Sequence, residues 1–446
     1  MINSLKNFDD KIAIVYKGNK YSYDELHSEI IKINNNVISG RIEKGDVVAI
    51  LSDYSFESIA LLISLHMNKN VIVPITSKHD DEINDRLKES FCNKKVIVDN
   101  GYIVDEVDSP TRHEMIDRLR DLNHSGLVLF SSGSTGKPKA MIHDFDNLVD
   151  TYKNKKSKSI NILLFLMFDH IGGINTLLNA LLTGATMIIP EDRGVDTVCS
   201  LMQDYKIRVL PSSPTFLNLI RISKADKRYD LSNIRMISYG TESMPEHLLV
   251  ELKRIFPKAK LLQTFGTSET GIAKTSSKSS SSTLMRIDDP NLKFKIIDGE
   301  LWLKSKTQVM GYLNSSMDCF TDDGWFKTGD VVEVSSDGFI KIVGRCKEVI
   351  NIGGEKVLPT EIESILLEMP EISDALVKGI PNAITGQTVY TEIVLSEEGK
   401  LLDSRKLKSQ IRKFCLNKID KYKVPTKIVF CDRTNFSSRF KKMRTK

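Results

Sequence analysis

The stretch that decides the fold is LVLFSSGSTGKPKA, which runs from Leu127 to Ala140. Its first four residues are apolar and predict a buried strand, Leu127 to Phe130. The residues that follow are rich in glycine, hydroxyl groups and lysine: Ser131, Ser132, Gly133, Ser134, Thr135, Gly136 and Lys137. Glycine lets backbone N–H groups approach a phosphate, hydroxyls donate hydrogen bonds, and lysine neutralises charge. We therefore predict a phosphate-binding loop after a buried strand, where α/β proteins hold their ligands.

This loop differs from the P-loop of nucleotide triphosphatases. A P-loop has four residues between its glycines and a Ser or Thr directly after the lysine. Here two residues separate Gly133 from Gly136, and Pro138 follows Lys137. The P-loop interpretation therefore fails. Two interpretations of the loop remain: a phosphate-binding loop of another kind, and an ordinary surface loop.

Strand-like and helix-like segments alternate on both sides of the loop. The expected strands and helices of two such units are Val47–Leu51, Phe56–Met67, Val71–Ile75, Ile162–Met167, Ile171–Leu182 and Thr186–Ile189. This alternation predicts an α/β fold with mostly parallel sheets. A further helix is expected near Pro245, where Ser243 and Glu246 have the spacing of a capping box.

Past Leu301 short strands dominate, and residues 331–343 predict a hairpin that turns at Asp337-Gly338. The serine-rich stretch 275–282 is expected to be a polar strand or loop of the large domain. A small α/β unit then follows, with a helix that begins at Pro359. We predict a large N-terminal domain (residues 1–344) with a β-rich subdomain, and a small mobile C-terminal α/β domain (residues 345–446).

Composition limits the class of protein. The chain has 446 residues, 41% hydrophobic and 27% charged, which suits two or three globular domains. Its six cysteines are scattered, so neither a zinc site nor a disulfide framework is expected. The longest apolar run, Ile162 to Phe168, is far shorter than the about 20 residues that cross a bilayer. With no signal-peptide core at the start, we expect a cytoplasmic protein.

The positive charge is concentrated at the C-terminal end. The whole chain has a net charge of +5, whereas residues 401–446 contain 15 Lys and Arg against three Asp. A solvated surface explains such a run, and so does an acidic or phosphate-rich partner. Nucleic acid is disfavoured because the run lacks an interleaved set of aromatic side chains.

Several further segments repeat known motifs in order: YSYDEL (21–26), FGTSET (265–270), GEL (299–301) with MGY (310–312), GWFKTGD (324–330) and GRCKE (344–348). Together with the loop at 131–140, this series resembles the adenylate-forming superfamily of acyl- and aryl-CoA synthetases, peptide-synthetase adenylation domains and luciferases. The resemblance covers nearly the whole chain and is closest to AMP-dependent acyl-acid ligases.

The resemblance implies an ATP site. Its residues are Ser131 to Lys137 in the loop, together with Gly240, Thr241, Phe265, Gly266, Thr267, Asp330 and Arg345. Phe265 offers a flat face for adenine, and Glu269 offers an oxygen ligand for Mg²⁺. Asp330 suits the ribose hydroxyls, and Arg345 suits ribose and phosphate oxygens.

The acid site is implied by the sequence FDHIGG, residues 168–173, with pocket residues Phe168, Asp169, His170 and Gly172. His170 matches the histidine with which acyl- and aryl-CoA ligases shape the carboxylate pocket and gate the thiol tunnel. Asp169 resembles instead the aspartate that pairs with the substrate ammonium in amino-acid adenylation domains. The alternative interpretation of Asp169 is a helix cap.

The family's last motif, G-K-x-x-R, carries a lysine that contacts the substrate carboxylate and the α-phosphate. Aligning by Arg444 places Lys441 at that position, although Phe440 replaces the glycine. Lys442 and Arg439 are the alternatives. We predict Lys441, Glu269, His170 and Lys137 as catalytic residues.

The implied reaction has two halves. The acid first reacts with ATP to give acyl-AMP and pyrophosphate. The C-terminal domain then turns about Lys347 and brings Gly353 and Gly354 toward the pocket, where a phosphopantetheine thiol takes the acyl group. That thiol belongs to CoA or to an acidic acyl carrier protein docked on the basic C-terminal domain. The alternatives are an amino-acid-activating enzyme that loads a carrier protein, and a non-catalytic nucleotide-binding scaffold.

Overall fold

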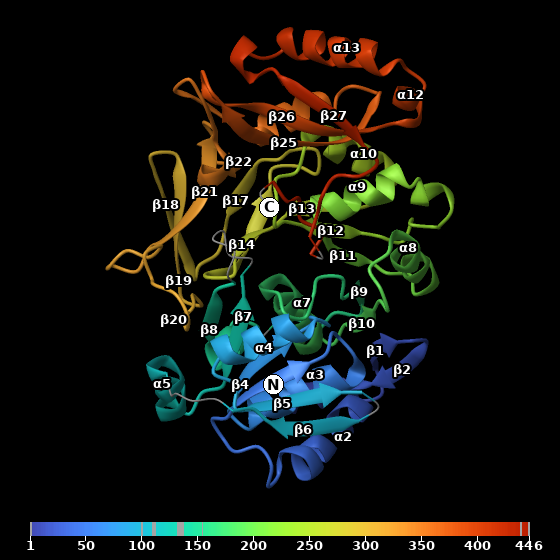
Figure 1. The fold of residues 1–446 in the computed structure, drawn as a ribbon. Coiled ribbons are helices and arrows are strands. Elements are labelled where there is room, and N and C mark those ends of the chain that lie inside the picture. Colours follow the sequence, from blue (N-terminus) through green and yellow to red (C-terminus); the bar gives the residue numbers. More distant parts are fainter. Residues whose placement is uncertain are drawn as a thin grey trace.

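Two seven-stranded sheets form the centre of the N-terminal part of the protein (Figure 1). The protein is seen here in a computed structural model, which describes residues 2–99, 101–108, 113–131, 138–153, 155–437 and 439–444. In sheet order, the first sheet contains β13 (Lys260–Gln263), β12 (Met236–Tyr239), β11 (Val209–Ser212), β9 (Asn161–Leu163), β10 (Thr186–Ile189), β1 (Ile12–Tyr16) and β2 (Asn19–Ser22). The second contains β20 (Gly311–Tyr312), β8 (Ala140–Asp144), β7 (Gly126–Phe130), β4 (Val71–Ile75), β3 (Val47–Leu51), β5 (Lys94–Val98) and β6 (Tyr102–Glu106).

Helices fill the space between these sheets and cover their outer faces. Helices α2 (Tyr23–Ile33), α3 (Phe56–Met67) and α7 (Ile171–Thr183) share one hydrophobic core with strands of both sheets. Helices α8 (Val195–Asp204), α9 (Pro214–Ile222) and α10 (Glu246–Ile255) pack on the outer face of the first sheet. Helices α4 (Asp80–Glu89) and α5 (Glu114–Leu122) pack on the second. The remaining N-terminal helices are α1 (Ile2–Leu5) and α6 (Phe145–Asp150).

The paired strands are parallel in β9–β13 and in β3, β4, β5 and β7, as the alternating pattern predicts. Strands β3 and β4 and helix α3 have the predicted bounds. The strand expected over residues 162–167 is shorter than predicted: β9 spans Asn161–Leu163. β9 pairs with β11 through a single residue pair. Beyond Leu163 the apolar run continues toward α7 as largely buried irregular chain.

A six-stranded antiparallel sheet forms the β-rich part. In sheet order it contains β16 (Thr275–Ser277), β17 (Met285–Ile287), β22 (Ile340–Arg345), β21 (Phe326–Val334), β19 (Glu300–Ser305) and β18 (Leu292–Ile297). A two-stranded sheet, β14 (Phe265–Thr267) with β15 (Gly271–Ala273), lies before it in the chain. The predicted hairpin is the β21–β22 pair, and the serine-rich stretch begins as the polar strand β16.

The capping box predicted at the start of α10 is wrong. The helix begins at Glu246 after Pro245, and no side chain caps it. The carboxylate of Glu246 pairs with Lys341 on β22 at 2.7 Å, so it is drawn toward the neighbouring sheet.

The C-terminal part is a small α/β unit with its own core. Its sheet contains β24 (Glu355–Val357), β23 (Ile350–Ile352), β26 (Gly386–Leu395), β25 (Ile372–Asn382) and β27 (Lys427–Cys431). Helices α11 (Pro359–Leu366) and α13 (Ser404–Leu416) pack on this sheet, and α12 (Glu397–Lys400) connects to it. Its buried cluster runs from Ile350 to Ile428, whereas β22 ends at Arg345 in the N-terminal part. None of the described helices is long and apolar enough to cross a membrane.

A buried histidine should make the fold sensitive to acid. His143 lies in β8 with 1% of its surface exposed, and burial lowers its pKa to about 4 despite the opposing effect of the nearby Ser268 backbone. In the unfolded chain a histidine titrates near ~6.5, so below that pH the unfolded state binds a proton that the folded state refuses. Folding stability is therefore lost as the pH falls from 6.5 toward 4.

We expect the wild type to lose about 2 kcal/mol of unfolding free energy through His143 between pH 7.5 and 5. Urea unfolding of wild type and His143→Gln at both pH values measures this contribution as a smaller pH dependence in the variant. The exposed His79 offers a control, because His79→Gln should leave the pH dependence unchanged. Equal pH dependence in wild type and His143→Gln would contradict the prediction.

Candidate active site

The predicted phosphate loop begins where β7 ends. The backbone N–H of Ser131 donates to the carbonyl oxygen of Lys139 at 3.1 Å, which ties the two ends of the loop together. Residues Ser132 to Lys137 lie outside the described residues, so their predicted roles in ATP binding stay predictions. The loop nonetheless starts from the carboxyl end of a buried strand, as expected.

Asp330 and Arg345 face each other in register on β21 and β22. The guanidinium Nε of Arg345 lies 3.0 Å from Oδ1 of Asp330. Asp330 is only 3% exposed, and its Oδ2 has no hydrogen-bond partner among the described residues. Burial raises the pKa of Asp330, while Arg345 and Lys441 oppose that shift. The pair therefore presents a buried acceptor oxygen and a cation side by side.

Lys441 reaches this pair from the C-terminal tail. Burial and the nearby Arg345 lower the pKa of Lys441, and three carboxylates oppose that shift: Glu242, Asp330 and Glu348. The lysine thus lies among residues of both parts of the chain. It forms no ion pair with another described side chain, so its ammonium is available to a ligand.

The neighbouring cations of the tail have other partners. Nζ of Lys442 lies 2.9 Å from Asp374 and donates to the carbonyl oxygen of Ala375 at 2.6 Å. Arg444 pairs with Glu348 at 3.0 Å and with Glu363 at 2.8 Å. Lys442, one of the two alternatives to Lys441, is therefore held by carboxylates of the C-terminal unit.

Asp169 and His170 lie at the start of α7. His170 is the N-cap residue, and its Nδ1 accepts a hydrogen bond from the backbone N–H of Gly172 at 3.1 Å. Burial and the nearby Arg439 lower the pKa of His170 to about 3, so its imidazole is neutral at ordinary pH. The helix-cap interpretation of Asp169 is wrong, because its neighbour His170 supplies the cap. Phe168, just before them, is fully buried.

Asp169 is a buried carboxylate between two guanidinium groups. Its Oδ2 lies 2.9 Å from Arg86 of α4 and 3.4 Å from Arg439 of the tail, and the residue is 2% exposed. Burial opposes its ionisation, but Arg439 and Arg86 outweigh that effect and hold the pKa of Asp169 below its usual value. An ammonium ion would have to compete with both cations for this carboxylate.

The segment after β12 has a strained backbone. Thr241 is exposed and adopts φ of 73°, a left-handed conformation that is uncommon for threonine. Such strain is often found at functional sites. Next to it, Glu242 accepts hydrogen bonds from the backbone N–H of Thr215 at 2.8 Å and of Lys442 at 3.3 Å. Burial raises the pKa of Glu242, and these donors oppose that shift.

Gly240 should not tolerate a side chain. A Cβ atom there would lie 2.7 Å from the carbonyl oxygen of Thr264, which is backbone and has little freedom to move. We expect Gly240→Ala to shift the strained segment and to lower kcat/KM for ATP by about 10-fold or more. Steady-state kinetics tests this, with Gly338→Ala, which strains the left-handed backbone of the exposed β21–β22 turn, as a control for a backbone disturbance elsewhere in the chain. Unchanged kinetics in Gly240→Ala would contradict the close approach.

Glu269 and the residues of β14 lie near β20. The hydroxyl of Tyr312 donates to Oε1 of Glu269 at 3.0 Å, and burial with the Glu269 charge raises the pKa of Tyr312, which keeps its proton. Phe265 is largely buried and packs in the β-rich core with residues such as Met285. Gly266 and Thr267 follow it on β14. Phe265 thus has only a small exposed surface to offer an adenine.

Glu269 fits the predicted Mg²⁺ ligand. One carboxylate oxygen accepts a hydrogen bond from Tyr312, and the other makes no hydrogen bond or ion pair with the side chain of a described residue. Mg²⁺ in phosphate-transfer sites is held by one or two carboxylates, with water and substrate phosphates completing its coordination. Tyr312, which binds Glu269, also lies 4.6 Å from Nζ of Lys139, measured to the ring centroid, so a single carboxylate here is consistent with that arrangement.

The predicted thiol-tunnel glycines are exposed. Gly353 and Gly354 form the tip of the β23–β24 hairpin, with φ of 61° and 98°. A Cβ on Gly354 would meet nothing within 4 Å. The predicted hinge, Lys347, lies in a short 3₁₀ turn, Cys346–Glu348, between β22 and β23. In this arrangement the tail with Lys441, and not the glycine hairpin, reaches the Asp330–Arg345 pair.

Two residues at this site, Glu242 and Arg86, were not predicted as site residues from the sequence. Glu242 stands beside the predicted Gly240 and Thr241, so its position was a usable signal. Arg86 lies in the polar helix α4 and belongs to no motif, so nothing in the sequence connects it with Asp169.

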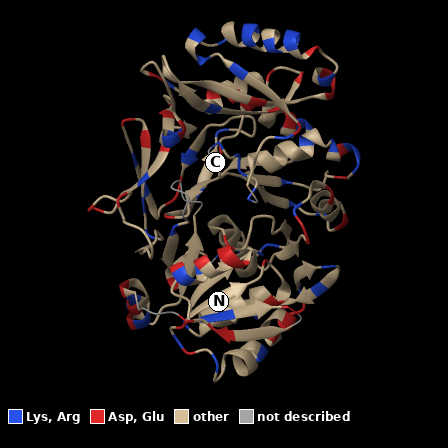
Figure 2. Ribbon diagram, viewed as in Figure 1, with Lys and Arg blue, Asp and Glu red and all other residues tan. Residues whose placement is uncertain are grey.

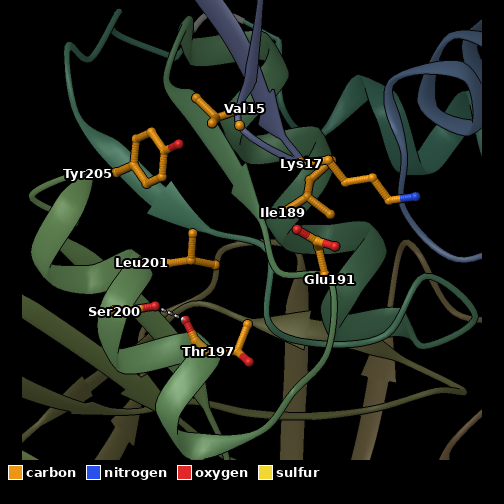
Figure 3. Close-up of a pocket in the computed structure, with 9 residues that line it drawn as sticks. Val15, Lys17, Ile189, Glu191, Thr197, Ser200, Leu201 and Tyr205 are labelled. Carbon is orange, nitrogen blue, oxygen red and sulfur yellow. Dashed lines mark hydrogen bonds between the residues drawn. The ribbon is translucent and has the colours of Figure 1, made fainter.

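A separate small pocket lies between β1, β10 and α8 (Figure 3). Its lining includes Lys17, Glu191 and Tyr205. None of the predicted site residues lines it, so it is distinct from the site described here.

Comparison with known proteins gives consistent matches over the chain. The sequence profile described as "AMP-binding enzyme" matches residues 3–313, and the profile of the "AMP-binding enzyme C-terminal domain" matches residues 361–441. The chain is 25% identical to a 2-succinylbenzoate–CoA ligase of Bacillus licheniformis over 98% of this chain and 96% of that protein. It is also 25% identical to the long-chain-fatty-acid–CoA ligase FadD13 of Mycobacterium tuberculosis, over 88% of this chain and 85% of that protein.

Solved structures share the fold. The anthranilate CoA ligase AuaEII in complex with anthranoyl-AMP has a TM-score of 0.83 at 18% identity, covering 99% of this chain and 95% of that one. The amide bond synthetase McbA of Marinactinospora thermotolerans has a TM-score of 0.81 at 18% identity, covering 99% and 97%. The two family matches together span well over half of the chain, residues 3–313 and 361–441. The chain therefore belongs to the AMP-binding enzyme family.

Proposed function

We propose that this protein is an ATP-dependent acid–thiol ligase, which activates a carboxylic acid as acyl-AMP and transfers the acyl group to a phosphopantetheine thiol. One observation carries the proposal: Lys441 of the C-terminal tail lies close enough to the Asp330–Arg345 pair of the N-terminal part for their charges to shift one another's pKa. Cations from two domains around one buried carboxylate suit a nucleotide whose ribose and phosphates must be held while the α-phosphorus reacts. The ligase names of the relatives support the same reaction class.

In the first half-reaction, a carboxylate oxygen of the acid attacks the α-phosphorus of ATP, and the bond to the pyrophosphate oxygen breaks. Asp330 accepts hydrogen bonds from the ribose hydroxyls. Arg345 and Lys441 stabilise the negative charge that develops on the α-phosphate. Glu269 would hold Mg²⁺, which supplies charge neutralisation for the phosphates.

In the second half-reaction, the thiol sulfur attacks the acyl carbonyl, the bond to the phosphate oxygen breaks, and AMP leaves. Lys441 must withdraw so that the Gly353–Gly354 hairpin can approach, which requires the C-terminal unit to turn about the segment that holds Lys347. Burial is the main cause of the lowered pKa of His170, so we expect its imidazole to stay neutral after Arg439 leaves with the tail. It can therefore line a thiol channel without attracting an anion.

The substrate is proposed to be an acid without an amino group that must be recognised. The carboxylate of Asp169 already pairs with Arg86 and Arg439. This arrangement disfavours the amino-acid-activating alternative, which needs Asp169 for the substrate ammonium. The presence of Lys441 beside Asp330 likewise disfavours the non-catalytic scaffold.

The acceptor is proposed to carry negative charge. Lys and Arg residues recur along α13 at the far end of the C-terminal unit (Figure 2), and Arg405, Lys406 and Lys413 are exposed there. Both CoA and an acyl carrier protein are anionic. Steering by this surface predicts that thioester formation slows as ionic strength rises.

The decisive experiment measures acid-dependent pyrophosphate release with Mg-ATP over a panel of aryl, fatty, hydroxy and amino acids. Each acid is then tested with CoA, with a phosphopantetheinylated carrier protein and with an amine as acceptor. We expect at least one acid without an amine to give release that Glu269→Gln suppresses, and a thiol acceptor to give a thioester. Release with amino acids alone, or an amide as the only product, would overturn the proposal.

A further inference from the structure

The C-terminal tail is a hairpin whose ends and tip bind different parts of the protein. Its two arms pair through Phe436 and Lys442, and the backbone N–H of Met443 donates to the carbonyl oxygen of Asn435 at 3.0 Å. The arms are fixed to the C-terminal unit, because Thr434 and Lys442 both bind Asp374, at 2.5 and 2.9 Å. The tip, with Arg439 and Phe440, enters the N-terminal part, to which the backbone N–H of Lys442 also donates a hydrogen bond through Glu242 at 3.3 Å.

The tip makes both polar and apolar contacts there. The guanidinium of Arg439 donates to the carbonyl oxygen of Phe130 at 3.2 Å and lies 3.4 Å from Oδ2 of Asp169. The ring of Phe440 lies 5.4 Å from that of Phe165 and 5.1 Å from that of Phe216, measured between ring centroids. Arg439 therefore touches both the strand that leads into the phosphate loop and the residue before His170.

Phe440 has a backbone conformation that glycine adopts more easily than phenylalanine does. Its φ is 50°, in the left-handed region where glycine is favoured. Phenylalanine is strained there, and its ring contacts with Phe165 and Phe216 offset the strain only while the tip is inserted. The backbone conformation of the tip is therefore stable only while the Phe440 ring is inserted into the N-terminal part.

Asp169 has two cation partners, so it keeps one when the other leaves. Arg86, fixed on α4, lies 2.9 Å from Asp169 and also contacts Glu82, so the buried carboxylate keeps a cation partner when Arg439 leaves. A buried carboxylate with no partner would be costly, whereas one that retains Arg86 is not. Arg439 can therefore bind and depart without stranding a charge.

The position of Arg439 is transmitted to Lys441 through the tip. The backbone N–H of Ser437 donates to the carbonyl oxygen of Lys441, and that of Phe440 donates to Ser437, both at 2.9 Å. These bonds hold Arg439 and Lys441, two residues apart, in one compact turn. A tip anchored through Arg439 carries Lys441 at a fixed place beside Asp330.

We propose that Asp169 and Arg86 form a receptor for Arg439, and that Arg439 is a positioning residue that latches the tail while Lys441 serves acyl-adenylate formation. Release of this latch frees the C-terminal unit for thioester formation. The proposal rests on the proposed two-step function. It gives Asp169 a partner within the chain, in place of a substrate ammonium.

The first test needs no acid substrate. Hydrogen exchange of the whole protein with Mg-ATP reports the amides of Ser437, Phe440 and Met443, whose hydrogen bonds exist in the docked hairpin. We expect Arg439→Ala and Asp169→Asn each to speed their exchange by about 10-fold or more. Arg433→Ala is the matched control, because Arg433 is an exposed arginine of the same segment. Unchanged protection in both variants would overturn the latch.

The second test separates the two half-reactions, with the acid that gives the largest pyrophosphate release and with its synthetic adenylate. Arg439→Ala should slow adenylate formation about 10- to 100-fold and leave thioester formation from supplied adenylate within about 2-fold of wild type. The Arg439→Ala/Asp169→Asn double variant should be no slower than the slower single variant, and Arg439→Lys should recover part of the rate. Equal slowing of both half-reactions, or additive losses, would overturn the proposal. If wild type releases no pyrophosphate with any acid while its tail is protected, the proposed function fails and the docking of Arg439 stands.

Discussion

Replacing Lys441 with alanine is expected to slow acyl-adenylate formation by about 10²- to 10³-fold, the usual loss when one preorganised charge is removed from a transition state. The side chain lies beside Asp330 and Arg345 and is not bound by another described carboxylate at ion-pair distance. The α-phosphate gains charge only as the carboxylate attacks it. Lys441 therefore acts mainly on the rate and less on ATP binding.

The same variant should form the thioester normally from a supplied acyl-adenylate, because Lys441 must leave the pocket before the thiol enters. Rapid-quench measurement of each half-reaction gives both rates. Lys421→Ala, which changes an exposed lysine of the C-terminal unit, controls for loss of positive charge. If Lys441→Ala slowed both half-reactions equally, the proposal that Lys441 acts only in adenylate formation would be contradicted.

Asp330→Ala is expected to lower kcat/KM for ATP by about 10²-fold, since hydrogen bonds to a charged group contribute about 1.5–3 kcal/mol each. The buried carboxylate has one oxygen free for the ribose, and its removal also leaves Arg345 without its partner. The comparison with 2′-deoxy- and 3′-deoxy-ATP makes the test specific. Wild type should discriminate against at least one of them, and Asp330→Ala should not.

Asp322→Ala is the matched control, because Asp322 is an exposed aspartate in the chain before β21. Its kinetics with all three nucleotides should equal those of wild type. If Asp330→Ala still discriminated against the deoxynucleotides as strongly as wild type, the ribose contact would have to lie elsewhere.

The architecture was largely predictable because its signals are local. Alternation of apolar strands and amphipathic helices identified β3, α3, β4 and α7, and Asp337-Gly338 identified the β21–β22 hairpin. The motifs placed Asp330 and Arg345 within a few residues of a turn, so their pairing across two adjacent strands follows from the register. Where local signals misled, a long-range contact was responsible, as with Glu246, which pairs with Lys341 and does not cap its helix.

The sequence by itself therefore determined the family, the strand that leads to the phosphate loop, and a short set of cations at the C-terminal end. Only the tertiary structure decided where each cation goes. Lys441 and Lys442 are adjacent in the chain, yet one lies beside Asp330 and the other is held by Asp374. Asp169 likewise acquired its partners from residues 83 positions before it and 270 positions after it. A charge selects its partner by distance and burial in space, and neither quantity is encoded in the spacing of residues along the chain.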